Sequence, residues 1–218
     1  MAGNTVIKKP YRTMGVSDYT FWKMKTDDKA NGTATYEDAY TLPGTVQITA
    51  SDSGGTQVFD ADNTAYEIDS YVEKMGHEIE NADVPPQVDK MWRGLNPDDL
   101  GVLIDNDTFG KTPNFAVAWK IKSGGGNYRL VKYFKGKYGF ASNVGAKTAN
   151  SEGAPEKQTA KASFTATFRD CDGKGYYYLD TGDLPDNVDK DEVIAKWFSE
   201  VDYVPEGTTV NPDETKGE

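Results

Sequence analysis

Few residues in this chain have the types and spacing that catalysis requires. The single histidine, His77, lies in a predicted strand, and neither a Ser–His–Asp set nor a G-x-S-x-G motif accompanies it. The single cysteine, Cys171, is flanked by charges of both signs, whereas a catalytic thiol needs a nearby base and an electropositive environment. We therefore interpret His77 as a surface or packing residue and Cys171 as a bystander, and we expect no enzymatic activity.

Two further patterns lack the residues that ligand binding needs. The segment DCDGKG begins like a calcium loop, but Lys174 stands where a third oxygen ligand belongs and Thr181 where the closing glutamate belongs. The triple glycine at 124–126 is not followed by Gly-Lys-Ser/Thr, so it is not a phosphate-binding loop. We expect both segments to be turns between strands, and we expect no metal and no cofactor.

The aromatic residues allow a second class of function, carbohydrate binding. If exposed, the tyrosines at 176–178 together with Trp22 or Trp92 have flat faces that stack on sugar rings. Carboxylates are abundant, although nothing places two of them across a cleft as a glycosidase requires. We favour aromatics that pack the core, and we retain a carbohydrate-binding β-sandwich module of a virion or secreted protein as the alternative.

Charge is segregated along the chain, whose net charge is −11. Residues 1–107 contain 9 Lys+Arg and 19 Asp+Glu. Residues 108–151 contain 8 Lys+Arg and no Asp or Glu, and residues 152–218 contain 7 Lys+Arg and 16 Asp+Glu. One interpretation is pairing within the fold, and another is complementary contact between subunits. A groove that binds nucleic acid is the least favoured of the three interpretations, because the net negative charge of the chain repels phosphate. We expect most of the basic stretch to meet acids of a neighbouring copy, so that salt weakens assembly.

Hydrophobic periodicity predicts many strands and two short helices. The predicted strands cover residues 19–25, 42–51, 57–60, 72–84, 100–105, 114–122, 127–135, 158–169 and 176–180. Helices are predicted in PPQVDKMWRGL and through Ile194 to Val201, the second with Asp186 or Asn187 as its N-cap. Residues 51–66 are predicted as an acidic loop around the short strand at 57–60, and residues 142–157 as a polar loop.

This order predicts an α+β, mainly β protein, an antiparallel β-barrel or sandwich with a flanking short helix and a C-terminal helix. We divide the chain into an N-terminal arm at 1–18, a β domain at 19–204 and an acidic tail at 205–218. We expect no transmembrane span, because no run of about 18 apolar residues occurs, and no secretory signal.

Several segments together resemble the major tail proteins of long-tailed bacteriophages, and most closely those of phages with Gram-positive hosts. The resemblance runs from about Tyr19 to about Val204 and rests on LPGTVQITAS, VFDADNTAYE, KMGHEIENADVP, PPQVDKMWRGL, NFAVAWKIKSGGGNYRLVKYFKGKYGF and QTAKASFTATF. It implies a virion protein, made in the host cytoplasm, that forms stacked hexameric rings. The resulting tail tube surrounds a tape-measure protein, joins tail-terminator and distal tail proteins, and conducts DNA without binding it specifically.

Charged residues in the arm, the loops and the basic stretch are the candidate contacts between subunits. They are Lys8, Lys9, Asp52, Asp60, Asp62, Lys132, Lys135, Lys147, Glu152 and Lys157. Antiparallel strands joined edge to edge across subunits remove exposed edges, and unlike charged patches suit contacts that close into rings.

Overall fold

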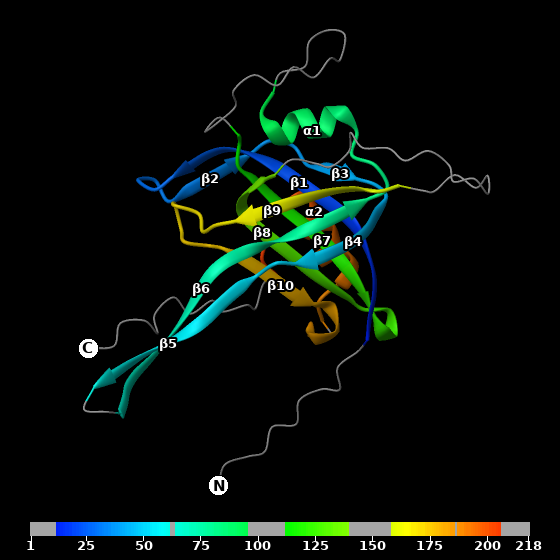
Figure 1. Ribbon diagram of the computed structural model, residues 1–218. Helices are drawn as coiled ribbons and strands as arrows, with labels where there is room; N and C mark the ends of the chain where they lie inside the picture. Colours follow the sequence, from blue (N-terminus) through cyan, green and yellow to red (C-terminus); the bar gives the residue numbers. More distant parts are fainter. Residues whose placement is uncertain (1–11, 62–63, 96–111, 140–157, 186, 206–218) are drawn as a thin grey trace, which may run out of the picture.

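The computed structural model describes residues 12–61, 64–95, 112–139, 158–185 and 187–205 (Figure 1). The predicted strand at 100–105 and the predicted loop at 142–157 lie outside these residues. The same holds for six of the candidate contacts, namely Lys8, Lys9, Asp62, Lys147, Glu152 and Lys157.

Strands dominate the described chain, as predicted. They are β1 Thr13–Asp28, β2 Thr33–Tyr36, β3 Tyr40–Leu42, β4 Thr45–Ala50, β5 Ser53–Ala61, β6 Thr64–Asn81, β7 Phe115–Ser123, β8 Tyr128–Tyr138, β9 Ala160–Ala166 and β10 Tyr176–Asp180. The α-helices are α1 Pro86–Arg93 and α2 Lys190–Ser199, and the short 3₁₀ turns are η1 Gly124–Gly126 and η2 Thr181–Asp183.

All strand pairs are antiparallel and belong to one sheet in the order β2-β1-β7-β8-β9-β6-β4. In addition, β3 pairs with β1, β5 with β6 and β10 with β8. The α+β, mainly β class is therefore confirmed. The sheet is open, with β2 and β4 at its ends, so the closed barrel that we also considered is not confirmed and the arrangement is a sandwich.

The sheet is covered on both faces by separate apolar clusters. One cluster lies inside the folded sheet and includes Phe21, Ile79, Trp92 and Phe164. The second lies between the sheet and α2; its fully or nearly fully buried members are Trp22, Ala116, Ala118, Leu130, Phe134, Val193, Trp197 and Val201. Burial of both faces explains why all residues from Phe115 to Trp119 are buried, although their alternation predicted one apolar face.

Both helices attach to the sheet through a tryptophan. In α1, Trp92 is fully buried and stacks on Tyr138 with ring centroids 4.0 Å apart. In α2, the N-cap is Asp189, whose carboxylate accepts hydrogen bonds from the backbone N–H groups of Asp191 and Glu192. The prediction of Asp186 or Asn187 as N-cap was wrong, because the helix begins only at Lys190.

Two predicted irregular segments are strands. Residues 13–18, assigned to the arm, begin β1 and pair with β7 through Thr13, Met14, Val16 and Ser17. Residues 53–61 form β5, which pairs with the first half of β6; the strand predicted at 57–60 is confirmed, and it also includes residues 53–56, which were assigned to the acidic loop. This β5–β6 hairpin extends beyond the rest of the sheet (Figure 1), and its solvent exposure removes the apolar alternation that normally marks a strand.

Close backbone approach requires glycine at one crossing of the sheet. β8 pairs with β10 through Arg129 to Tyr133 and with β9 from Gly136 onward. A Cβ atom at Gly136 would collide with the Phe164 ring and the Thr165 carbonyl oxygen. Glycine therefore allows β8 to pass from one partner strand to the other.

Candidate functional site

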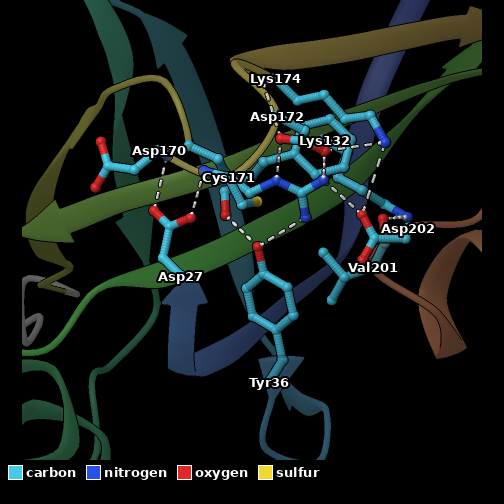
Figure 2. A network of polar contacts seen from close by, with 11 residues as sticks. Asp27, Tyr36, Lys132, Asp170, Cys171, Asp172, Lys174, Val201 and Asp202 are labelled. Carbon is cyan, nitrogen blue, oxygen red and sulfur yellow. Dashed lines mark hydrogen bonds and ion pairs between the residues drawn. The ribbon is translucent and has the colours of Figure 1, made fainter. Parts of the chain in front are cut away.

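A network of charged side chains holds the turn between β9 and β10, and we call it the charged clasp. It consists of Asp27, Tyr36, Lys135, Arg169, Asp170, Asp172, Lys174 and Asp202; Figure 2 shows most of these residues. They come from β1, β2, β8, the 169–175 turn and the segment after α2. The clasp therefore joins parts of the chain that lie far apart in sequence.

Asp27 is the anion at one end of the clasp. Its carboxylate accepts the backbone N–H groups of Asp170 and Cys171, each at 2.9 Å, and the Lys135 ammonium at 2.7 Å. Burial raises the pKa of Asp27, but these hydrogen bonds outweigh burial and hold the pKa well below its usual range. The carboxylate thus fixes the turn to the end of β1.

Arg169 is the cation at the other end. Its side chain is 2% exposed, bonds Asp172, lies 2.7 Å from the Asp202 carboxylate and donates to the Tyr36 hydroxyl. The guanidinium also lies over the Phe134 ring, 4.8 Å from its centroid. Burial raises the pKa of Asp172, but Arg169 and the backbone and side chain of Lys174 lower it overall to about 2.

Cys171 lies in the turn that the clasp holds, and its thiol is unsuited to act as a nucleophile. Burial, followed by its hydrogen bond to Asp27, raises the pKa of the thiol to about 11. A thiol of this pKa stays protonated at neutral pH, whereas the thiolate is the reactive form. The calcium-like segment at 170–175 uses its carboxylates in these ion pairs, and no group of three or more His, Cys, Asp or Glu residues in the described chain could hold a metal.

His77 packs in the apolar interior, as one of our two interpretations predicted. It is 1% exposed, with Trp119, Tyr133 and Phe164 as ring neighbours and a 2.8 Å hydrogen bond between Nε2 and the Tyr19 hydroxyl. Burial lowers the pKa of His77 to about 3, so the ring is neutral at physiological pH.

Lys132 is buried within the subunit, so its prediction as a contact between subunits was wrong. Its side chain faces α2, and its ammonium donates to the carbonyl oxygens of Glu200 at 2.7 Å and Val201 at 3.1 Å. The Trp197 ring centroid lies 4.6 Å from the ammonium. Burial lowers the pKa of Lys132 to about 7, against the opposing attraction of Asp202 and Glu200.

Other members of the basic stretch pair inside the chain, contrary to our expectation of intersubunit pairing. Lys120 pairs with Asp18, and Arg129 forms a two-point pair with Asp180. Lys135 is 9% exposed and is held by clasp carboxylates within its own chain. The interpretation of pairing within the fold therefore applies to these residues.

Two acidic candidates lie at the hairpin. The Asp52 carboxylate joins the hairpin base to the sheet, because it accepts the Tyr133 hydroxyl at 3.1 Å and the Gly76 N–H at 2.8 Å. Asp60 lies near the end of β5. Asp52 is thus already engaged within its own subunit.

The hairpin exposes a set of apolar side chains that we call the hairpin surface. It consists of Val58, Phe59, Ile68, Tyr71 and Val72, which are 47–65% exposed. Sequence patterns missed this surface because isolated apolar residues among Ser, Gly, Thr and Asp are typical of a loop. Successive residues of a strand point to opposite faces, so these side chains are divided between the two faces of the hairpin.

β4 and β5 follow one another along the same side of β6 and form an edge of the sheet from Thr45 to Ala61. Before Asp60, the only charged residue in this edge is Asp52, whose carboxylate is bonded inside the subunit. Edge strands of monomeric proteins are usually blunted by charges, proline or bulges. The β5 part of this edge therefore lacks charge protection against pairing with another strand, whereas the β4 part lies beside β1.

A groove of about 400 Å³, the tyrosine groove, lies beside β10. Its lining residues are Tyr176, Tyr177, Tyr178, Leu179, Trp197, Val204 and Pro205. Tyr176 and Tyr178 are 44% and 64% exposed, and their rings stack with centroids 6.3 Å apart. Trp22 and Trp92 are buried, so our alternative in which they bind sugar beside the tyrosines was wrong for both.

No helix in the described residues has both the length and the apolar character needed to cross a membrane. No protein-family model matches the chain, and no curated protein matches it.

Proposed function

We propose that this chain is a virion structural protein, a tail-tube subunit that assembles with its own copies into stacked hexameric rings. The rings form a hollow tube that surrounds a tape-measure protein, joins tail-terminator and distal tail proteins at its ends, and conducts DNA. The ring and tube follow from the resemblance of the sequence to phage major tail proteins. Self-association itself is supported by the molecule's own surfaces.

The observation that carries the proposal is the open edge of β5. This edge carries no charge from Ser53 to Phe59, and it extends beyond the rest of the sheet next to the hairpin surface (Figure 1). A strand of this kind pairs readily with a strand of another chain. Contacts between unlike edges of identical subunits are heterologous, and such contacts close into rings or continue as filaments.

The acidic character of the chain suits a conduit for DNA. With a net charge of −11, the assembled protein repels phosphate on average. Each phosphate contact with a cation adds to DNA affinity, and a conduit needs little affinity. Pairing of Lys120, Arg129 and Lys135 with carboxylates leaves these cations less available to DNA.

Size-exclusion chromatography with light scattering, followed by negative-stain microscopy, tests the proposal. Rings or tubes are expected at high protein concentration without any added cofactor. A strictly monomeric protein in both low and moderate salt would contradict self-assembly.

The second candidate function is carbohydrate binding, which the exposed pair Tyr176 and Tyr178 favours. Stacked aromatic rings at the surface offer apolar faces that suit pyranose rings. A monomer whose intrinsic tryptophan fluorescence changes on titration with glycans would support this function in place of the tail tube.

A further inference from the structure

The outer edge of β10 presents unpaired backbone groups. The Phe134 N–H donates to the Gly175 carbonyl oxygen at 3.1 Å, and β10 then pairs with β8 from Tyr176 to Asp180. Hydrogen-bonded pairs alternate along an antiparallel ladder, so Tyr177 and Leu179 bond β8. The N–H and C=O groups of Tyr176 and Tyr178 therefore point away from β8, and they have no backbone partner among the described residues.

The tyrosine groove runs beside this edge. Trp197, Val204 and Pro205 supply apolar lining, and residues 176–179 of β10 supply the remainder. An exposed backbone edge beside apolar walls is the geometry that accepts an added strand, because backbone bonds give affinity and side-chain pockets give specificity. The groove thus fits an extended polypeptide segment.

The same chain offers an extended segment of matching chemistry. Residues 53–59 of β5 carry no charge, and β5 pairs only with β6, so its other edge is open in the described chain. Val58 and Phe59 on this strand are 47% and 61% exposed. Asp60, near the end of β5, is the one charged residue of this strand, and the other described charged residues of the hairpin, Glu67, Asp69, Glu73 and Lys74, lie on β6.

The hairpin is fixed to the sheet at its base. Asp52 bonds both the Tyr133 hydroxyl and the Gly76 N–H where the hairpin leaves the sheet. Beyond this anchor the hairpin extends past the rest of the sheet (Figure 1). A projecting edge and a separate receiving groove on one chain are unlike surfaces, as a heterologous contact requires.

We propose that β5 of one copy adds as a strand to the free edge of β10 in a second copy, with apolar side chains of the hairpin entering the tyrosine groove. This assignment rests on the proposed self-assembly and names one of its contacts. The contact can repeat from copy to copy, because each chain keeps one hairpin and one groove.

Two substitutions at one position separate the backbone edge from the tyrosine side chain. Tyr178→Pro removes an outward N–H and leaves the donors of Tyr177 and Leu179 to β8, and proline is tolerated where an edge N–H faces solvent. Tyr178→Ala removes the ring and keeps the N–H. Sedimentation velocity should show that Tyr178→Pro raises the concentration needed for association at least about tenfold, and that Tyr178→Ala has a smaller effect. Circular dichroism and thermal unfolding check that both variants fold.

Cross-linking tests the contact without weakening it. In a Cys171→Ser background, Gln57→Cys places a thiol on β5 and Tyr178→Cys places one on β10. A short bismaleimide should cross-link the Gln57→Cys protein to the Tyr178→Cys protein when the two are mixed. As a control, Lys122→Cys places the thiol at an exposed position outside the groove, and a mixture of this protein with Gln57→Cys should give no cross-linked product.

The outcomes separate this contact from the proposed function. If the parent protein assembles but Tyr178→Pro associates normally and no mixed product forms, the β5–β10 contact is wrong and self-assembly stands. A parent that stays monomeric contradicts self-assembly as well. Glycan binding that Tyr178→Ala abolishes, without any mixed cross-link, assigns the groove to sugar and overturns the contact.

Discussion

At the scale of single residues, Lys132 is the charge whose environment departs furthest from expectation. It lies between Leu130 and Phe134 on the face of β8 that α2 covers. Its ammonium replaces water with two carbonyl oxygens at the end of α2 and with the face of Trp197. Burial of a cation without a directly bonded carboxylate disfavours the charged form, which explains its lowered pKa.

Replacing Lys132 with methionine is expected to change how stability depends on pH. The folded-state pKa of about 7 lies below the ordinary value of 10.5, so between these pH values the unfolded chain binds more protons than the folded chain. Wild-type stability should therefore rise with pH in this range, relative to Lys132→Met, by up to about 1.4 kcal/mol per pH unit. Urea denaturation across this range measures the difference.

The exposed Lys122→Met is the matched control, and it should follow the wild-type pH dependence. If Lys132→Met also follows it, the ammonium is better solvated than its position indicates. At low pH the variant should be no less stable than the wild type, because an apolar side chain of similar volume often replaces a buried charge without loss.

The sequence indicates which residues are apolar but not which faces are covered. Ala160, Ala162 and Phe164 alternate with polar residues, and β9 buries them as predicted. The sequence predicted that Lys132 and Lys135 face solvent, because no local pattern shows that α2 covers the first and the 169–175 turn covers the second. The partners that neutralise Lys135, Asp27 and Asp170, are 108 and 35 residues away in sequence.

At the scale of elements, the charged clasp fixes the 169–175 turn to the end of β1. The Asp27 carboxylate accepts three hydrogen bonds, two from backbone N–H groups of this turn and one from the Lys135 ammonium. These contacts have no sequence signal, since an aspartate near a strand end is common. The hairpin was predicted only in part, as strands at 57–60 and from residue 72 onward. A strand pair exposed on both faces selects few apolar residues, so Gly54 and Gly55 were assigned to a loop.

Asp27→Asn is expected to destabilise the fold by about 2–3 kcal/mol at neutral pH, because the Lys135 ammonium loses a directly bonded carboxylate in a largely buried position. The neighbouring Asp28→Asn is the control; Asp28 is partly exposed and bonds only residues of its own turn, so its effect should stay below about 0.5 kcal/mol. Chemical denaturation measures both.

Acid should remove the stabilisation that the Asp27 carboxylate provides. The pKa of Asp27 is below its unfolded value, so its stabilisation is fully present above about pH 4 and is lost as the pH falls further. The difference between wild type and Asp27→Asn should therefore shrink on acidification. An unchanged difference would assign the effect to packing of the side chain and not to its charge.

At the scale of the whole molecule, charge and apolar surface have separate roles. The net charge is −11, and the cations Lys120, Arg129 and Lys135 pair within the subunit. Two approaching copies therefore repel each other on average, while the edges proposed to join them, β5 and β10, are almost free of charge. Association in this arrangement depends on backbone pairing and apolar burial, and it proceeds against electrostatic repulsion.

Moderate salt is therefore expected to strengthen assembly, the reverse of what the segregated charge alone predicts. Raising the ionic strength from about 0.01 M to about 0.15 M shortens the screening length from about 30 Å to about 8 Å, which reduces repulsion between acidic copies. Backbone bonds and apolar contacts persist under these conditions. Sedimentation velocity across this range should show larger species at the higher salt, at a fixed protein concentration. If salt instead dissociates the assemblies, ion pairs between subunits carry the association, and the exposed basic residues Lys122 and Lys137 become the first positions to reverse in charge.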